Sequence, residues 1–322
     1  MRTPTVTVIA LCYNHERFVL DCLESIRAQT FQDFELIVID DCSRDHSPQV
    51  IANWLAEHYP AARFIRHEVN RGICASLNEA LALAQGTYVS MTATDDTWLP
   101  HKLASQVALA QSLDADTAVI YADAGQMDEA GALLPKPFIE AHGVTDPPQG
   151  RIFNRLADGN FIPAMATLIR RDALEAVGGY DERLNYEDYD MWLRLADRYA
   201  FAFQPEVVAN YRIVATSMVR TVFAQPSAWF HHSNFLIRQK WLRSDRLTRQ
   251  QRALWADKMW WAAYGLFVLD DRRAASCLWL AFRHSGRPRA AVLALTSRLG
   301  VSRARLMRLR RVVTGMTRGT PT

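Results

Sequence analysis

Residues 34–41 read Phe-Glu-Leu-Ile-Val-Ile-Asp-Asp, an apolar run that ends in two carboxylates. A short run of aliphatic and β-branched residues is typical of a strand that is buried on both faces. After the acidic pair, apolar residues between 50 and 55 recur at the spacing of one helix face. The stretch therefore predicts a strand, a loop that carries Asp40 and Asp41, and a helix.

The same unit of strand and helix occurs on both sides of this stretch. Residues 6–11 form a β-branched run, and helically spaced apolar residues follow between 19 and 26. Further along, residues 73–84 predict a helix and residues 88–91 a strand. Alternating strands and helices indicate the α/β class, with a mainly parallel sheet that is covered by helices on both faces.

Acidic pairs mark the ends of the predicted strands. Asp40-Asp41 and Asp95-Asp96 each follow a strand, and Glu187-Asp188 opens a helix predicted over about residues 187–199. A single pair of this kind is commonly a solvated turn or a helix cap. Ligands bind at the carboxyl ends of strands in such sheets, and carboxylate oxygens are the preferred ligands of hard divalent cations. The recurrence therefore favours a cation site that neutralises a diphosphate.

The regular alternation of strands and helices weakens after a strand predicted at residues 118–121. A hairpin is predicted around residues 129–131, and residues 146–148 form a proline-rich loop. From about residue 217 the chain is predicted to be entirely helical and is rich in Trp and Arg. We therefore predict a catalytic domain of residues 1–216 and a C-terminal helical region with a basic tail, residues 217–322.

The net charge of +3 is distributed unevenly. Residues 241–322 carry seventeen Lys and Arg against four Asp, a balance of +13, which leaves −10 for residues 1–240. Arginines between 303 and 311 alternate with Leu306 and Leu309 and suit either an anionic membrane surface or a solvated tail. Nucleic acid is a poor fit, because the tail has no recognition module and the catalytic part is acidic.

The cysteines and the apolar stretches bear on the compartment. Five cysteines stand at scattered positions, a pattern of reduced thiols rather than of a disulfide framework. No export signal is visible, and the longest apolar stretch, residues 259–269, has eleven residues where a spanning helix needs about 20. We expect a cytoplasmic protein, peripheral on the inner face of the membrane if its basic region binds there.

The order of motifs resembles the family 2 glycosyltransferases, which have the A-type nucleotide-sugar fold. The resemblance covers about the first 215 residues. Its motifs combine strands, their terminal acids and short glycine-containing turns: Val6-Thr7-Val8-Ile9, Cys12-Tyr13-Asn14, Ser25-Ile26, Gln29-Thr30, residues 34–41, Asn70-Arg71-Gly72, Leu77-Asn78, Ala84-Gln85-Gly86, Asp95-Asp96, Trp98-Leu99-Pro100, residues 178–182 and residues 187–190. Each motif is weak alone, but their order and spacing together are specific.

The resemblance implies a set of residues that bind the nucleotide sugar. They are Tyr13, Asn14, Asp41, Arg71, Gly72, Asn78, Asp96 and Arg212. Tyr13 and Asn14 would lie against the base, the alternative being a capped loop. Asp41 would accept the imide N–H of uracil. The segment 71–78 would lie by the nucleotide or form a simple turn and helix cap, and Arg212 would lie near the phosphates or a closing loop.

The resemblance also implies the chemical roles. Asp95 would be the principal ligand of Mg²⁺ or Mn²⁺, with Asp96 as a supporting group or helix cap, and Asp188 would be the general base. Two departures stand against the family pattern: Ala93 replaces the first acid of the usual Asp-x-Asp, and Ile213-Val214 stands where many members carry a His. We therefore expect a cation held largely by donor phosphate oxygens and water.

These observations predict an inverting glycosyltransferase that moves a sugar from a nucleotide-diphosphate donor, UDP in the first place, to an acceptor hydroxyl. The acceptor would be a glycan or a lipid-linked glycan in bacterial polysaccharide or glycolipid assembly. The alternative is a non-catalytic scaffold that binds sugar nucleotides, which the missing acid at position 93 favours. A nucleotidyltransferase would need a glycine-rich phosphate loop after the first strand, and the sequence lacks one there. Dehydrogenase and kinase signatures are also absent.

Overall fold

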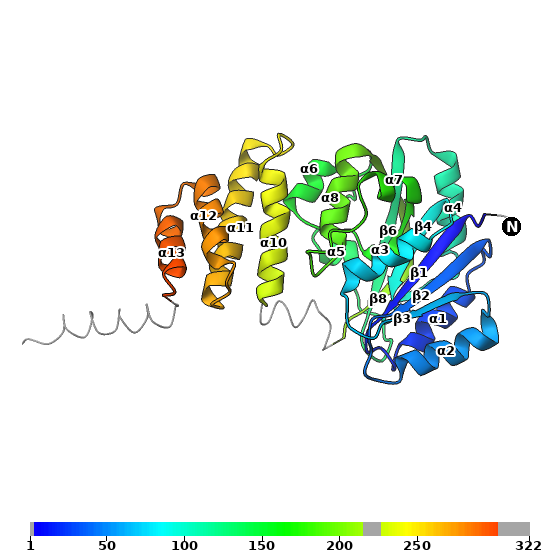
Figure 1. Ribbon diagram of the computed structural model, residues 1–322. Coiled ribbons are helices and arrows are strands. Elements are labelled where there is room, and N and C mark those ends of the chain that lie inside the picture. Colours follow the sequence, from blue (N-terminus) through cyan, green and yellow to red (C-terminus); the bar gives the residue numbers. More distant parts are fainter. Residues whose placement is uncertain (1–2, 215–226, 302–322) are drawn as a thin grey trace, which may run out of the picture. The chain divides into compact units, whose positions relative to one another are not determined.

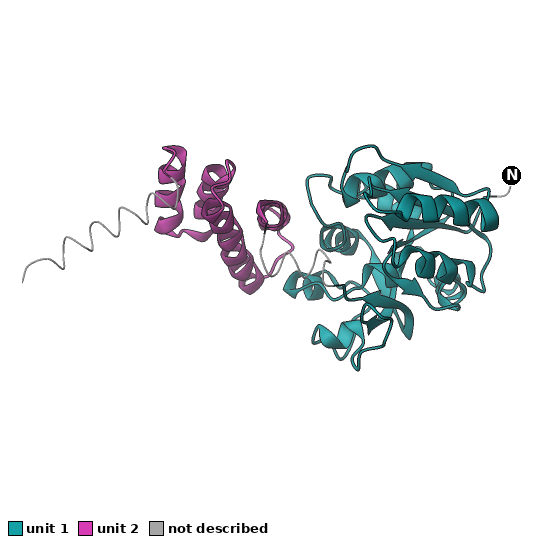
Figure 2. Cartoon of the chain, turned by 90° about the horizontal axis from the view of Figure 1, so that it is seen from below, with its two compact units in different colours: residues 1–217 teal, residues 218–322 magenta. Residues whose placement is uncertain are grey.

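The computed structural model describes residues 3–214 and 227–301. The chain divides into two compact units, residues 1–217 and 218–322 (Figure 2). The predicted boundary between residues 216 and 217 lies outside the described residues, and so does the basic segment 303–311. The two units are described separately below.

An eight-stranded mixed sheet forms the centre of the first unit (Figure 1). The strand order is β3-β2-β1-β4-β7-β6-β8-β5. The strands are β1 (Val6–Cys12), β2 (Phe34–Asp40), β3 (Arg63–Arg66), β4 (Tyr88–Ala93), β5 (Thr97–Trp98), β6 (Thr117–Met127), β7 (Thr167–Arg170) and β8 (Ala200–Arg212). Strands β1 to β4 pair in parallel, while β7 is antiparallel to both of its neighbours. The predicted mainly parallel α/β sheet is thereby confirmed.

Helices cover both faces of this sheet. The helices of the first unit are α1 (Val19–Arg27), α2 (Ser47–His58), α3 (Ile73–Leu83), α4 (Lys102–Ser112), α5 (Phe138–Ala141), α6 (Phe153–Asp158), α7 (Arg171–Ala176) and α8 (Asp188–Arg198), with a 3₁₀ turn at Ala164–Ala166. Residues of α1, α2 and α4 share one core with Val6, Val8 and Ala10 of β1. Helix α3 lies on the opposite face (Figure 1).

The strand register brings the polar strand ends to one edge of the sheet. Cys12 pairs with Asp40, Asp40 with Arg66, and Leu11 with Ala93. The residues that directly follow these strands therefore lie at a single edge, as the carboxyl ends of parallel strands must. This edge carries Tyr13, Asp41 and Asp95.

The long pair of β6 and β8 reaches the same edge from the other half of the sheet. The two strands are parallel, and their register runs to Met127 beside Arg212. After β6, the Asp128 carboxylate accepts the N–H groups of Ala130 and Ala132, and Met127 bridges to Leu133 in antiparallel fashion. The predicted hairpin around residues 129–131 is confirmed, and the turn lies next to Arg212.

The described part of the second unit is helical. It consists of α10 (Ala228–Leu242), α11 (Arg249–Val268), α12 (Ala274–Ser285) and α13 (Pro288–Arg298). Thr248 caps α11 in a reciprocal capping box with Gln251. The ring of His231 lies so close to Gly265 that a Cβ there would be 2.3 Å from it. Since only glycine leaves room for this ring, Gly265 sets the close crossing of α10 and α11.

Within the described ranges, residues 3–214 and 227–301, no helix is long and apolar enough to cross a lipid bilayer.

Candidate functional site

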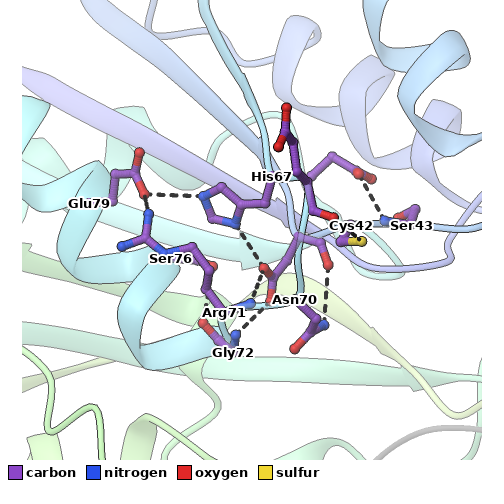
Figure 3. Close-up of polar contacts among 11 residues, drawn as sticks. Cys42, Ser43, His67, Asn70, Arg71, Gly72, Ser76 and Glu79 are labelled. Carbon is purple, nitrogen blue, oxygen red and sulfur yellow. Dashed lines mark hydrogen bonds and ion pairs between the residues drawn. The ribbon is translucent and has the colours of Figure 1, made fainter.

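Asp41 organises the loop that follows β2. Its Oδ1 accepts the Arg71 N–H at 2.8 Å, and its Oδ2 accepts the Gly72 N–H at 2.8 Å (Figure 3). Gly72 has a φ of 84°, a left-handed value that side chains rarely adopt, and it precedes α3. Asp41 therefore fixes the start of α3 as well as presenting a carboxylate at the sheet edge.

A buried histidine connects Asp41 to a second carboxylate. His67 directly follows β3, and its side chain is only 5% exposed. Its Nδ1 lies 2.8 Å from Asp41 Oδ1, and its Nε2 lies 3.1 Å from Glu79 Oε2. Glu79 also pairs with the Arg71 guanidinium (Figure 3). The four side chains form one polar network behind the predicted base-binding position, and they hold Asp41 in a single orientation.

His67 gives a first test of this network. Replacing His67 with Phe keeps the volume but removes both contacts, and hydrogen bonds to charged groups contribute about 1.5–3 kcal/mol. We expect the Kd for UDP to rise by about tenfold or more while kcat changes little, since Asp41 is predicted to contact the base of the donor. Titration calorimetry and donor kinetics measure the two effects.

Two further variants make the His67 result specific. His67→Asn keeps a donor that reaches Asp41 and should retain most of the affinity. His101→Phe alters an exposed histidine beside Glu206 and should have no effect. If His67→Phe bound UDP as tightly as wild type and His67→Asn do, the network would have no role in donor binding.

The loop after β1 is tied to the loop after β2 through Asn14. Asn14 has a left-handed φ of 58°, its N–H donates to Ser43 Oγ, and its Oδ1 accepts the Arg44 N–H at 2.8 Å. Its side-chain oxygen therefore binds the neighbouring loop. Tyr13 beside it is 45% exposed at the same edge, where its ring is free to contact a planar base.

Asn78 is directed at a different part of the molecule. Its amide Nδ2 donates to the Tyr180 carbonyl and to Glu182, and its Oδ1 accepts the Tyr180 N–H at 2.7 Å. A Cβ at Gly179 would lie 2.7 Å from this oxygen, so only glycine fits there. Asn78 holds the turn 178–182 against α3. This geometry favours a structural role over the predicted position at the nucleotide.

The second acidic pair lies in the loop after β4, and its two members have different environments. Asp96 is buried, and its Oδ1 accepts the Arg212 N–H at 2.8 Å. Burial, the nearby charge of Asp95 and that of Glu187 raise the pKa of Asp96 well above its usual range. The Asp95 side chain is 14% exposed, and its Oδ2 lies 3.8 Å from His15 Nε2. Asp95 is thus the member that can meet a ligand.

Arg212 supports this loop with every group of its guanidinium. Nε donates to the Asp95 carbonyl at 2.8 Å, Nη1 donates to the Glu129 carbonyl, and Nη2 pairs with Asp21 at 3.1 Å. The guanidinium also lies over the Phe18 ring. Its side chain is only 4% exposed. Arg212 thus ties the Asp95-Asp96 loop to the turn at Glu129 and to Asp21 of α1, and its predicted position near the phosphates stays a prediction.

Glu187 and Asp188 stand at the start of α8, where both are partly buried. Asp188 Oδ2 accepts the Asn160 amide at 2.7 Å, and its Oδ1 accepts the Tyr189 N–H at 2.6 Å. Burial raises the pKa of both groups, and the charge of Asp188 helps to raise the pKa of Glu187 to about 8. Burial therefore favours the protonated form of Glu187, while the hydrogen bonds to Asp188 favour its ionised form.

The Glu187 proton makes stability depend on pH. The folded state holds this proton up to about pH 8, whereas an ordinary glutamate releases it near 4.5. The stabilising effect is therefore complete below about 4.5 and is lost as the pH rises through about 8. In the absence of nucleotide and cation, Glu187→Gln should be more stable than wild type above pH 8, with little difference near pH 5. Urea denaturation at both pH values checks this, with exposed Glu57→Gln as the control. Parallel pH profiles for Glu187→Gln and wild type would contradict it.

The first turn of α3 connects the three acidic regions. Cys74 follows the Gly72 that Asp41 holds, and its Sγ lies 3.7 Å from the Tyr186 carbonyl, next to Glu187. Tyr180 lies close by and donates its hydroxyl to Met91 of β4. Burial raises the pKa of Cys74, and the charges of Glu187 and Asp188 add to the effect. The structure thus brings the predicted base-binding, cation-binding and proton-accepting residues to one side of the sheet.

Three residues at this site escaped the sequence prediction. His67 directly follows β3 and His15 is the third residue after β1, so the strand-end rule used for the acids would have found both. Asn160 belongs to an irregular loop between α6 and the 3₁₀ turn, and nothing in its local sequence indicates that it meets Asp188.

The site supplies some, but not all, of the ligands that a divalent cation needs. The partly exposed Asp95 carboxylate is a suitable oxygen ligand, since Asp96 is bound to the Arg212 amide. Within residues 3–214 and 227–301 there is no group of three or more His, Cys, Asp or Glu side chains that could hold a metal ion. A cation bound at Asp95 would need oxygens from the donor.

Known proteins are similar to this chain in sequence or in fold. An uncharacterized glycosyltransferase of Rickettsia prowazekii is 25% identical over 231 residues, which is 69% of this chain and 68% of that protein. Residues 1–349 of S. aureus TarS in complex with UDP-GlcNAc have a similar fold, with a TM-score of 0.64, 16% identity and coverage of 97% of this chain and 92% of that one. The mannosyltransferase PcManGT from Pyrobaculum calidifontis, in complex with GDP-Man and Mn²⁺, gives a TM-score of 0.58, 19% identity and coverage of 95% and 83%.

The family model described as glycosyl transferase family 2 matches residues 7–178, more than half of the chain. This match spans the loops that carry Asp40-Asp41 and Asp95-Asp96, and it ends at Gly178, before Glu187-Asp188. The chain therefore belongs to glycosyl transferase family 2.

Proposed function

We propose that this glycosyltransferase moves a sugar from a UDP-linked donor to an acceptor hydroxyl with inversion at the anomeric carbon. The observation that carries the proposal is the pairing of Glu187 and Asp188. The two adjacent carboxyls are partly buried, burial raises the pKa of Glu187 to about 8, and the Asp188 carboxylate accepts hydrogen bonds from Asn160 and Tyr189. An ionised, desolvated carboxylate near the donor end is what a hydroxyl needs as a general base.

The proposed roles follow the order of the loops along the sheet edge. Tyr13 would stack on the base, and Asp41 would accept the imide N–H of uracil with the lone pair that the backbone amides leave free. Asp95 would hold Mg²⁺ or Mn²⁺ against the diphosphate, where the cation offsets the charge of the leaving group. Arg212 and Asp96 keep the Asp95 loop in place. Asp188 would accept the proton of the attacking hydroxyl, and Asn160 would hold its carboxylate in line.

The similar structures support the choice of donor and cation. TarS was crystallised with UDP-GlcNAc and the Pyrobaculum mannosyltransferase with GDP-Man and Mn²⁺. These ligands belong to those proteins, and the present chain differs from both at more than four positions in five. Between the two bases, a single carboxylate at Asp41 suits the one imide N–H of uracil.

A donor screen tests this proposal. The full-length chain is incubated with Mn²⁺ and a panel of UDP- and GDP-sugars, and the released nucleotide and the anomeric configuration of the product are followed by NMR. We expect UDP-sugars to be preferred and the configuration to invert. Retention of configuration would contradict the role of Asp188, because a retaining reaction does not use a lone general base on the acceptor.

We also propose that the acceptor is a lipid-linked glycan at an anionic membrane surface, as in bacterial polysaccharide or glycolipid assembly. The basis is the balance of +13 in residues 241–322, together with exposed Trp229, Trp261 and Trp279 in the helical unit. Tryptophan and arginine are both suited to the interfacial region of a bilayer. Such binding would place a cytoplasmic enzyme on the inner face of the membrane.

Sedimentation with vesicles tests the membrane proposal. The protein should pellet with anionic vesicles at low salt and return to the supernatant at high salt, because screening weakens the attraction. Vesicles of zwitterionic lipid serve as the control. Equal recovery in the supernatant with both kinds of vesicle would contradict the proposal.

A further inference from the structure

His15 occupies a position between two loops of the site. It directly follows Tyr13 and Asn14 after β1, and its N–H donates to Ser47 Oγ at the start of α2 at 3.0 Å. Its Nδ1 lies 3.0 Å from the hydroxyl of Thr94, which is fully buried. The backbone and one ring nitrogen are therefore fixed, and the ring has a defined orientation.

The second ring nitrogen is directed at the predicted cation site. Nε2 of His15 lies 3.8 Å from Asp95 Oδ2, and the two side chains are 22% and 14% exposed. When Nδ1 donates its proton to the Thr94 oxygen, Nε2 carries the lone pair, which is the tautomer that binds metals. A metal-binding histidine usually has its other nitrogen fixed by such a contact.

We propose that His15 is the second protein ligand, beside Asp95, of the divalent cation that the donor diphosphate brings to this site. The inference rests on the proposed cation-dependent function. Two ligand atoms at bond lengths of about 2.1 Å span at most about 4.2 Å around one ion, so the observed separation is within reach. His15 would thereby contribute the second side-chain ligand in a loop where Ala93 and Thr94 supply no carboxylate.

A nitrogen ligand changes the choice of cation. Mg²⁺ and Mn²⁺ both bind carboxylate and water oxygens, but an imidazole nitrogen adds more to the affinity of a first-row transition-metal ion such as Mn²⁺ than to that of Mg²⁺. UDP should therefore bind more tightly with Mn²⁺ than with Mg²⁺, and the difference should depend on His15.

Three variants of the full-length chain separate the possibilities. His15→Asn keeps an amide that can donate to Thr94 but removes the nitrogen directed at Asp95. His15→Asp replaces the nitrogen with a carboxylate oxygen. His58→Asn is the matched control, because His58 also lies beside a carboxylate, Glu24 at 4.0 Å, at the end of α2 remote from Ser47.

Two measurements report on the ligand without relying on turnover. Pulsed EPR of the complex with Mn²⁺ and UDP should show nitrogen coupling in wild type and in His58→Asn, and none in His15→Asn. Titration calorimetry should show that His15→Asn weakens Mn²⁺-supported UDP binding by about tenfold or more, as loss of even an outer-shell partner can. His15→Asp should shift the preference toward Mg²⁺.

The outcomes distinguish this inference from the proposed function. If wild type binds UDP only with the cation, but without nitrogen coupling and with unchanged affinity in His15→Asn, His15 is not a ligand and the proposed function stands. If UDP binding by wild type does not depend on a cation, the cation site itself is wrong, and the inference is overturned with it. Loss of coupling together with lower Mn²⁺-supported affinity in His15→Asn supports the inference.

Discussion

Replacing Asp188 with Asn is expected to lower sugar transfer by roughly 10²- to 10⁴-fold while UDP binding is retained, because an amide of nearly the same shape cannot accept the proton of the hydroxyl. The Asn160 and Tyr189 contacts to Asp188 make this a matched substitution, since the side chain is held by hydrogen bonds that an amide can partly keep. If Asp188 were only a carboxylate favoured by the helix dipole, the change would cost about 0.3–1 kcal/mol of stability and leave turnover intact.

The neighbouring acids serve as controls for Asp188. Asp190 is fully buried and paired with Arg194 at 2.7 Å, so Asp190→Asn should reduce stability rather than the chemical rate. Glu187→Gln keeps a neutral group where burial favours a protonated carboxyl, and it should retain most of the activity at neutral pH. More than about a tenth of wild-type turnover in Asp188→Asn, with normal UDP binding, would assign the base to another group.

Replacing Asp95 with Ala is expected to abolish the cation dependence of UDP binding and to lower transfer by at least about 10²-fold. Removal of a single group that stabilises a developing negative charge has effects of roughly 10²- to 10³-fold. Asp95 is the carboxylate that remains accessible, since Asp96 is bound to Arg212.

Titration calorimetry with UDP, with and without Mn²⁺, measures the Asp95 effect on binding, and donor turnover measures the effect on rate. Asp128→Ala is a suitable comparison, because that carboxylate is engaged in its own turn after β6. A wild-type protein whose affinity for UDP is the same with and without the cation would contradict the assignment.

The sequence predicts the sheet because its signal is local. The strand at residues 34–40 and the helix that follows are both apolar at the required period, and the terminal acids mark the edge where ligands bind. The positions of Asp41, Asp95 and Asp188 at one side of the sheet follow from the parallel register together with the placement of α8. The order of motifs was sufficient for the family, as the match over residues 7–178 confirms.

The contacts that set the role of each polar residue are not local. Asn78 meets Tyr180, which is 102 positions away, and Arg212 meets Asp96 at a separation of 116. No periodicity encodes such partners, because they arise only when the long strand β8 and the turn 178–182 pack against the first half of the sheet. The sequence could therefore not identify the contacts of Asn78 and Arg212, and the roles predicted for them at the nucleotide stay predictions.

In the helical unit, too, local patterns are visible in the sequence, whereas the contacts between helices are not. The apolar residues of α11 that recur at helical spacing, Trp255, Met259, Trp260, Ala263 and Phe267, are buried, and Tyr264 among them is partly buried. The close crossing of α10 and α11 depends on Gly265 and His231, and the spacing of apolar residues in the sequence singles out neither of them. The proposed membrane role rests largely on the net positive charge of residues 241–322, which the sequence shows without identifying the binding partner.

The rate at which the full-length chain releases UDP from UDP-sugars, measured with and without Mn²⁺, tests the central claim most directly. The account predicts release that needs the cation and that Asp188→Asn removes while its Kd for UDP stays near the wild-type value. Cation-dependent binding of UDP without release from any UDP-sugar, with acceptor lipid and glycan extracts present, would contradict the account and identify a scaffold that binds sugar nucleotides without turning them over.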